Sequence, residues 1–352
     1  MPTTGSADPT VETFETLEAL PPDALALFDR SAEFFGSRLW WSVVLAHAVP
    51  KNASPMLAAV RVAGRYVALL PLLQQPGGWH SLTPPYSCAF TPAVAAGIDA
   101  DRALIALARF CRSAAVTRLD CLPAEWVGLS PLRTAAVRAG LRPLSFDHFG
   151  NWYEDVGGLD WASYLRLRPG ALRETVRRRV RKAESLTNLS FDIFTDPADM
   201  DRAVAAYESV YRRSWKAAEL FPDFNAALIR ATAEAGWLRL GILSNGLEPV
   251  AAQFWVVRDK QAVVLKLAHD EAFKAHSPGT VLTAFMLRHL LDREHVARID
   301  FGRGDDSYKQ GWASSRRQRV GMLLVNPFRL GGLAAWLRHT GGRARTKLRS
   351  NP

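Results

Sequence analysis

The segment IDFGRGDDSYKQGW, residues 299–312, gathers carboxylate, guanidinium, phenol, ammonium and indole groups within a short stretch of chain. These groups belong to Asp300, Arg303, Asp305, Asp306, Tyr308, Lys309 and Trp312. A short strand is expected over 297–301, so they follow its carboxyl end, where active sites commonly form. A carboxylate there could take a proton from an attacking amine, Tyr308 could protonate a leaving group, and Lys309 could hold an anion or a carbonyl oxygen. The alternative is a solvated loop held by ion pairs.

A second candidate site follows the apolar strand expected over 262–268. The loop AHSPGT leads from it into a nearly all-apolar helix, expected over 280–293. Ser277, Pro278 and Gly279 occupy the expected N-cap and first turn, with His276 just before them. Free backbone N–H groups and the helix dipole favour an anion there, and glycine lets a phosphate approach closely. An ordinary capped helix is the alternative, because neither a Walker loop nor a G-x-G-x-x-G spacing is present.

Two further features are candidate contacts for a substrate. The expected helix ALRETVRRRVRKAE, residues 171–184, carries six basic and two acidic residues, and Arg177 shares one face with Arg173 and Arg181. It favours a phosphate-rich or uronate-rich partner, and its lack of aromatic residues makes single-stranded nucleic acid a poorer fit. Trp215 ends a long amphipathic helix expected over 197–216. The alternative for the basic helix is an ordinary solvated helix, and the alternative for Trp215 is packing in the core.

Composition excludes several classes of protein. The chain has 352 residues, of which 48% are hydrophobic, so it is long enough for two domains with cores of their own. We expect no transmembrane helix and no signal peptide. The three cysteines fit neither a disulfide framework nor a four-ligand zinc site, and the eight histidines lack paired spacing, so no metal is predicted. No motif favours a covalent nucleophile. The expected location is a reducing cytoplasm.

The charge is unevenly distributed along the chain. Residues 1–150 contain 12 basic and 12 acidic residues, whereas residues 151–352 contain 32 and 22 and so carry the whole net charge of +10. The two halves therefore have different tasks, and the basic half suits an anionic partner, such as a nucleotide-type cofactor, an acidic carrier protein, RNA or a lipid surface.

Taken together, residues 160–325 resemble the GNAT acyltransferase superfamily, and within it the CelD-type acetyltransferase branch associated with cellulose biosynthesis, which is related to the Fem-type aminoacyltransferases. The resemblance rests on the RRRVRKAE helix, the Ser-Trp pair at 214–215, the AAQFW strand, the SPGT loop with its helix, and GDDSYKQGW. EFFGSRLWW and VALLPLL in the first half resemble the partner GNAT-like domain.

The resemblance implies an α/β (α+β) fold of two tandem GNAT-like domains, each a mixed central sheet flanked by helices. We expect a flexible leader at 1–20 and an N-terminal GNAT-like domain at 21–157, degenerate and lining the acceptor cleft. A catalytic GNAT-like domain at 158–326 and a basic tail at 327–352 complete the division. The tail, with Leu333, Trp336 and Leu337 among arginines, is typical of an interfacial helix.

The resemblance also implies an acyl-CoA donor, such as acetyl-CoA, and direct attack by an amine or hydroxyl of a sugar, a polysaccharide precursor or a small amine. Asp306 or Asp305 would be the base or acceptor anchor, Tyr308 the acid and Lys309 the electrostatic group. The donor would be held by His276, Ser277, Pro278, Gly279 and Thr280, and the substrate by Trp215, Arg303, Trp312 and Arg177.

Two other functions remain open. One is a Fem-type transferase that uses aminoacyl-tRNA on a cell-envelope precursor, which the basic half also suits. The other is a non-catalytic basic scaffold at the anionic inner membrane surface, held by the tail.

Overall fold

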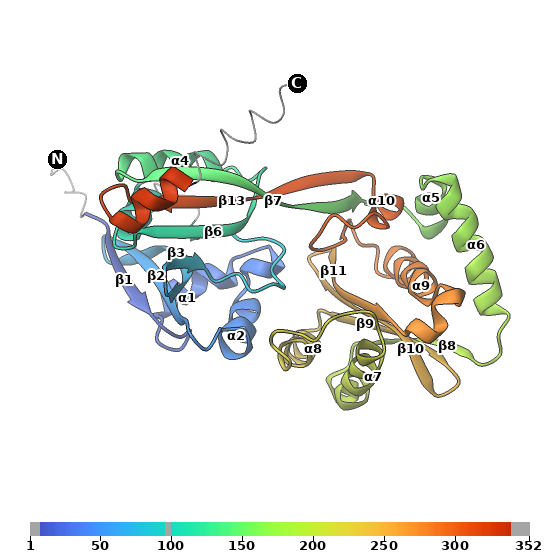
Figure 1. Ribbon diagram of the computed structural model, residues 1–352. Helices are drawn as coiled ribbons and strands as arrows, with labels where there is room; N and C mark the ends of the chain where they lie inside the picture. The colour runs from blue at the N-terminus through green and yellow to red at the C-terminus, as the bar shows by residue number, and fades with distance from the viewer. Residues whose placement is uncertain (1–7, 96–99, 339–352) are drawn as a thin grey trace, which may run out of the picture. The chain divides into compact units, whose positions relative to one another are not determined.

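The computed structural model describes residues 8–95 and 100–338. The chain packs into two compact units, one formed by Met1–Phe149 with Gln318–Pro352 and the other by Gly150–Arg317 (Figure 1). Two strands, β7 (Arg142–Asp155) and β13 (Ser315–Val325), have residues in both units. Each unit is a mixed sheet flanked by helices, as the sequence predicts.

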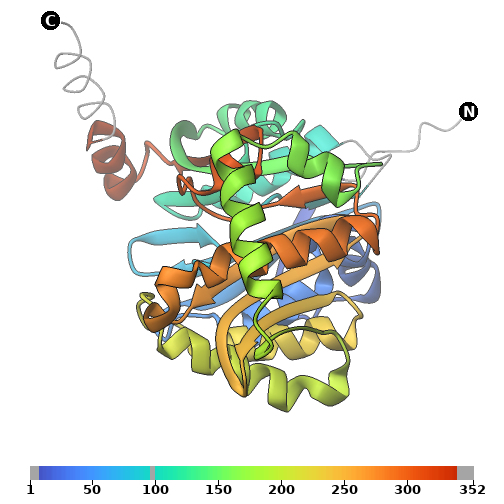
Figure 2. The same ribbon diagram turned by 90° about the vertical axis from the view of Figure 1, so that its right-hand side faces the viewer.

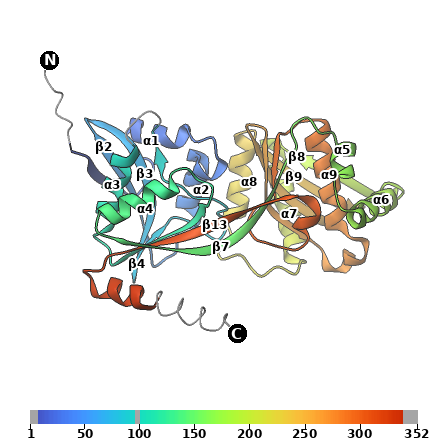
Figure 3. The same ribbon diagram turned by 90° about the horizontal axis from the view of Figure 1, so that it is seen from above.

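The first unit orders its strands β1-β2-β3-β4-β6-β13-β7, and a short β5 pairs with β3. The strands are β1 (Thr10–Phe14), β2 (Ser54–Val62), β3 (Arg65–Gln75), β4 (Gly78–Ser81), β5 (Ala93–Val94) and β6 (Val116–Pro123). The helices are α1 (Pro22–Asp29), η1 (Phe34–Gly36), α2 (Arg38–His47), α3 (Ala100–Cys111) and α4 (Leu129–Arg138). Helices α3 and α4 lie side by side (Figure 3).

The start of the chain differs from the expected flexible leader at 1–20. Residues 10–14 form β1, which pairs antiparallel with β2 from Thr10–Arg61 to Phe14–Leu57. Residues 1–7 lie outside the described residues. The acidic, weakly patterned sequence does not predict this strand. Its partner is distant in the chain, and β1 is an edge strand, which is paired on one side only.

The second unit orders its strands β7-β12-β11-β10-β9-β8. The strands are β8 (Leu189–Phe194), β9 (Leu238–Asn245), β10 (Glu248–Arg258), β11 (Gln261–His269) and β12 (Arg298–Asp300). The helices are α5 (Trp161–Arg166), α6 (Gly170–Glu184), η2 (Pro197–Asp199), α7 (Met200–Arg212), α8 (Phe224–Glu234), η3 (Glu271–His276), α9 (Pro278–Asp292) and α10 (Lys309–Trp312).

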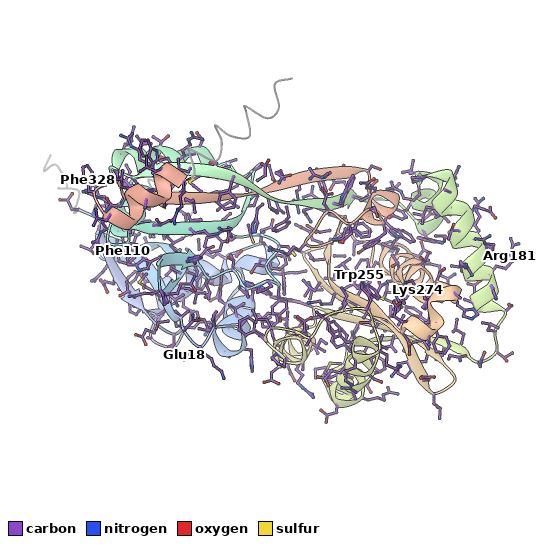
Figure 4. All side chains as sticks on the ribbon, in the orientation of Figure 1. Glu18, Phe110, Arg181, Trp255, Lys274 and Phe328 are labelled. Carbon is purple, nitrogen blue, oxygen red and sulfur yellow. The ribbon has the colours of Figure 1, made fainter. Side chains whose placement is uncertain are left out.

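Both faces of the second sheet are covered by helices. Helix α9 packs on β9, β10 and β11 from one side, and α7 packs on the same three strands from the other (Figure 1). Helix α6 lies outside α9, and Figure 2 shows it crossing in front of α9. Trp255 of β10, labelled in Figure 4, is buried in the core beneath α9. This double burial explains why β10 and α9 are apolar on nearly every side.

Strands β11 and β12 run parallel but separate early. They pair only from Gln261–Arg298 to Val263–Asp300, after which β11 continues to His269 while β12 ends. Helix α9 makes the crossover between them and begins just beyond the end of β11. Beyond Val263 the edge of β11 is therefore no longer paired with β12, and α9 begins beyond the carboxyl end of β11, which is the usual place for a ligand in such a sheet.

The division of the chain differs in detail from the predicted boundaries at 157/158 and 326/327. It falls after Phe149 and after Arg317, within the long strands β7 and β13. The end of β13 pairs with β6 from Arg319–Pro123 to Val325–Val116, which assigns these residues to the first unit.

The described part of the tail ends in a helix at 330–338. Its expected continuation through 352 lies outside the described residues. Phe328 and Leu330 are 80% and 88% exposed, and Leu333, Trp336 and Leu337 are exposed as well. Across the described residues, every helix is too short or too polar to cross a membrane.

Candidate functional site

The first turn of α9 offers backbone N–H groups at the end of β11. Ser277 occupies the N-cap position in the left-handed conformation, with φ of 55°, and its carbonyl accepts from Val281 at 3.1 Å. Ser277 is the N-cap residue that the sequence predicts, and within the described residues its side chain makes no capping hydrogen bond. Pro278 has no N–H, and the N–H groups of Gly279 and Thr280 belong to the first turn, where a helix provides no internal acceptor. An anion could bind them.

Two aromatic rings stand beside this turn. The Trp215 and His269 ring centroids are 4.5 Å apart, and a Cβ atom on Gly279 would lie 3.5 Å from His269 Nδ1. Lys216 Nζ lies 5.3 Å from the Trp215 ring centroid. Trp215, three residues beyond α7, thus meets the last residue of β11 and the first turn of α9. We call Trp215, Lys216, His269 and Gly279 the α9 N-terminal cluster.

Burial shapes the charge of this cluster. It lowers the pKa of Lys216, and the nearby Lys266 lowers it further, while Asp306 opposes the shift. Burial also lowers the pKa of His269 below its ordinary value, so its imidazole is neutral at pH 7. Lys266 itself is held by Glu219 at 2.5 Å. The cluster therefore combines oriented N–H groups with a partly desolvated ammonium, a combination suited to phosphate.

The loop before α10 is held closed by Lys309. This side chain is 2% exposed, and its Nζ donates to the carbonyl oxygens of Arg303 at 2.6 Å and Gly304 at 3.2 Å. Asp306 Oδ2 lies 3.0 Å from the same nitrogen. Gly304 has φ of +100°, a conformation that other residues rarely adopt. Lys309 therefore stabilises the loop, with its donors directed at the loop's own oxygens.

The two neighbouring carboxylates have different surroundings. Asp305 accepts from Trp152 Nε1 at 2.6 Å and from both Nε and Nη2 of Arg316. The hydrogen bonds from Arg316 and Trp152 lower the pKa of Asp305. Asp306 is 59% exposed on its side chain and pairs with Lys309. Asp306 is thus the more accessible of the two carboxylates.

Tyr308 lies on the open side of the same loop. Tyr308 as a whole residue is 42% exposed, yet loss of solvent around the phenol, and secondarily Asp306, raises the pKa of Tyr308. The phenol therefore stays protonated at neutral pH and is available as a proton donor.

Trp312 has a structural position. It is buried, and its carbonyl oxygen accepts from Tyr164 Oη and from Arg168 Nη1 at 3.0 Å. Arg168 is paired with Glu154 at 2.5 Å, and both are buried. These bonds fix the chain just after the loop, so the indole packs in the core and does not face solvent.

The structure brings together only some of the predicted residues. Trp215 lies beside the turn at Gly279, and the charge of Lys216 is affected by Asp306 and Lys309, which links the SPGT turn to the 303–309 loop. Arg177 and His276 are exposed, and Arg303 contributes its carbonyl oxygen to the bond with Lys309.

Sequence reasoning missed His269, and it gave no role to Lys216, the neighbour of Trp215. A usable signal existed, since His269 directly follows the strand expected over 262–268 and Lys216 follows the Ser-Trp pair. Of the described residues, no group of three or more His, Cys, Asp or Glu could hold a metal ion.

Comparison with known proteins identifies part of the chain. Residues 170–310 match the family model of the acetyltransferase (GNAT) domain. This stretch of the chain is therefore similar to GNAT acetyltransferase domains. The match includes α6, the α9 N-terminal cluster and the loop up to Lys309. Among the curated proteins, none matches this chain.

Several solved structures share the fold over most of the chain. The structure of FemX aligns with a TM-score of 0.58 at 11% identity, covering 90% of this chain and 98% of that one. A conserved protein of unknown function from Bacteroides thetaiotaomicron also gives 0.58, at 12% identity, covering 90% and 100%. The C-terminal domain of an Agrobacterium fabrum protein, named for lysylphosphatidylglycerol synthetase, gives 0.57 at 13% identity, covering 89% and 93%. At these identities the likeness concerns the fold alone.

Proposed function

We propose that the protein is an acyltransferase that moves an acetyl or other acyl group from acyl-CoA to an amine or hydroxyl. The observation that carries this proposal is the α9 N-terminal cluster at the carboxyl end of β11, where β11 is no longer paired with β12, within the stretch similar to GNAT domains. A pyrophosphate is a dianion that fits two free N–H groups next to an ammonium. We assign the acceptor to sugars, polysaccharide precursors or small amines, as the CelD-type branch would.

The donor is held by the first turn of α9 and by Lys216. The N–H groups of Gly279 and Thr280 bind the pyrophosphate, and Lys216 adds charge from the side of Trp215. Neutral His269 lies between them and can donate one hydrogen bond. Ser277 sets the entry of the turn through its left-handed backbone.

The transfer needs no acyl-enzyme. The acceptor nitrogen or oxygen attacks the thioester carbonyl carbon, the new C–N or C–O bond forms, and the C–S bond breaks. The acceptor proton passes to the accessible Asp306 carboxylate, and Tyr308 gives its proton to the departing thiolate. Lys309 keeps the loop in shape and so positions both groups.

The test is a thermal-shift titration with CoA, acetyl-CoA and longer acyl-CoAs. A ligand that binds only the folded protein stabilises it by about 2.7 kcal/mol at 100 times its Kd, so the melting temperature must rise. The Gly279→Trp variant places an indole against His269 and blocks the turn. Leu247→Trp adds the same ring at a fully exposed hairpin position and is the matched control.

The expected result is a rise in the wild type and in Leu247→Trp that is lost in Gly279→Trp. If the melting temperature of Gly279→Trp still rises with CoA, the donor does not bind at this turn. No rise with any CoA would overturn the acyl-CoA donor and favour aminoacyl-tRNA, the Fem-type alternative. That alternative is then measured as RNA binding with a steep salt dependence.

A further inference from the structure

A cavity of about 220 Å³ lies in the second unit, on the side of α9 that faces α6. Its walls come from α6, the end of β9, the start of β10, η3 and the start of α9. Pro278 and Val281, three residues apart, turn one face of α9 toward it, whereas Gly279 faces His269. The cavity lining contains none of the four residues of the α9 N-terminal cluster.

The floor of the cavity is apolar. Ala183, Leu243, Val250 and Val281 are buried and line it, and Phe273 adds a ring from η3. A volume of this size accepts a short chain or a single ring and is below the range of drug-sized ligands, about 300–1,000 Å³. Water alone gains little from such a surface, because an apolar floor offers it no hydrogen bonds.

The rim of the cavity is cationic. Arg179 and Lys182 of α6 line it, and His276 and two asparagines supply its other polar groups, so none of the described lining residues is acidic. The Nε atom of Arg179 is buried without a hydrogen-bond partner in the described structure. This nitrogen is closed to solvent, so an acidic head group at the rim would pair with the charge of the Arg179 guanidinium and with the ammonium of Lys182.

These positions show that α6 has two different faces. Arg179, Lys182, Ala183 and Leu186 are spaced so that they share the side that lines the cavity. Arg177 and Arg181 are exposed, and Figure 4 shows Arg181 on the outer side of the helix. The basic helix is therefore more than a solvated surface, although the cations that reach the cavity are not those singled out from sequence.

We propose that this cavity is a second ligand site, which binds a small amphipathic anion with its apolar part on the floor and its acidic head at Arg179 and Lys182. Medium-chain carboxylates have this chemistry, and a short-chain phosphate monoester shares it. The site is distinct from the donor site of the proposed function, although Pro278 and His276 border both.

The test is isothermal titration calorimetry of the full chain with octanoate, octyl phosphate and octanol. Both anions should bind, and octanol should bind at least about tenfold more weakly because it brings no charge to the guanidinium. Arg179→Met keeps the apolar stem of the side chain but removes the donor, and should weaken octanoate binding by about tenfold or more. Lys182→Met is a second variant at an exposed position, and Arg177→Met is the matched control on the outer face.

Loss of octanoate binding in Arg179→Met or Lys182→Met, with Arg177→Met unchanged, supports the site. Equal binding of octanol, equal binding in all three variants, or no binding at all overturns it. The ratio of octanoate to octyl phosphate affinity distinguishes the two head groups.

A repeat titration in saturating CoA separates this proposal from the proposed function. Undiminished octanoate binding supports two sites, and competition by CoA would overturn the second site by making the cavity part of the donor site. If CoA fails to bind at all, octanoate binding alone still decides whether the cavity is a site.

Discussion

The lysines of the second unit show how one residue type takes different roles. Lys309 is buried and directs its donors at the carbonyl oxygens of Arg303 and Gly304, so it holds a loop. Lys216 is half-buried over Trp215, and its pKa is lowered. The sequence motif singled out Lys309 for electrostatic work, whereas we propose that Lys216 supplies charge to the donor. No local pattern could show this, because it depends on which carbonyls and rings the fold brings to each ammonium.

The lowered pKa of Lys216 predicts how CoA binding depends on pH. The ammonium is charged only below its pKa, so CoA affinity should fall as pH rises through a midpoint below the ordinary lysine value of 10.5. Lys216→Arg should keep its affinity over the same range, because a guanidinium stays protonated. Calorimetric titration with CoA at stepped pH measures both. If the CoA affinity of Lys216→Arg falls at alkaline pH by the same amount and with the same midpoint, the effect belongs to another group.

At the scale of elements, sequence pattern predicts what is local. The strand, loop and helix from 262 to 293 were recognisable from an apolar run, a Ser-Pro-Gly turn and a second apolar run, and they form β11 and α9. The strand β1 was missed because its partner β2 is distant in the chain. The turn η3 was expected to be a loop, and it depends on Asp270, whose carboxylate accepts from Ala272 N at 2.8 Å.

Asp270 joins three elements that support the donor site. It is buried, caps η3, and accepts from Arg213 Nε just beyond α7 at 2.5 Å. Burial raises its pKa, but the hydrogen bonds from Arg213 and Ala272 outweigh that effect, so the pKa of Asp270 is lowered overall. The stabilisation is therefore complete above the unfolded-state value of about 3.9 and is lost as pH falls through the lower folded value.

The Asp270→Asn variant should lower the free energy of unfolding by about 1–3 kcal/mol at pH 7, since a charged hydrogen bond is replaced at a buried position. Urea unfolding of the wild type and the variant at pH 7 and at pH 3 measures the difference. Asp192→Asn, on the exposed side of β8, is the control. The difference in free energy of unfolding between the wild type and Asp270→Asn should be smaller at pH 3 than at pH 7. An equal difference at both pH values would contradict a role for the charge of Asp270.

At the scale of the whole molecule, composition predicted two folded units and a charge imbalance between halves of the chain. It could not show that the first unit takes residues from both ends of the chain, because this follows from the pairing of β13 with β6. Apolar residues beyond β13 are exposed, and we propose that the segment 327–352 contacts an anionic membrane surface. Phe328, Leu330 and Leu333 provide apolar area, and six basic residues of this segment provide charge.

The tail proposal predicts that the protein sediments with vesicles containing phosphatidylglycerol and remains in solution with pure phosphatidylcholine. Replacing Phe328 and Leu330 by serine should weaken binding severalfold, because two exposed apolar side chains no longer enter the interface. Val127→Ser, at a 90% exposed position elsewhere in the first unit, is the matched control. Equal sedimentation of both variants with the vesicles would contradict the assignment.

The pairing of β13 with β6 has a consequence for the order of events during synthesis. Strand β6 leaves the ribosome early, but its neighbour β13 is translated only after the whole of Gly150–Arg317. During that interval the edge of β6 presents unpaired backbone groups, which can pair with another chain. The first unit therefore keeps an open strand edge until β13 has been made, whereas the residues of the second unit are contiguous in the chain.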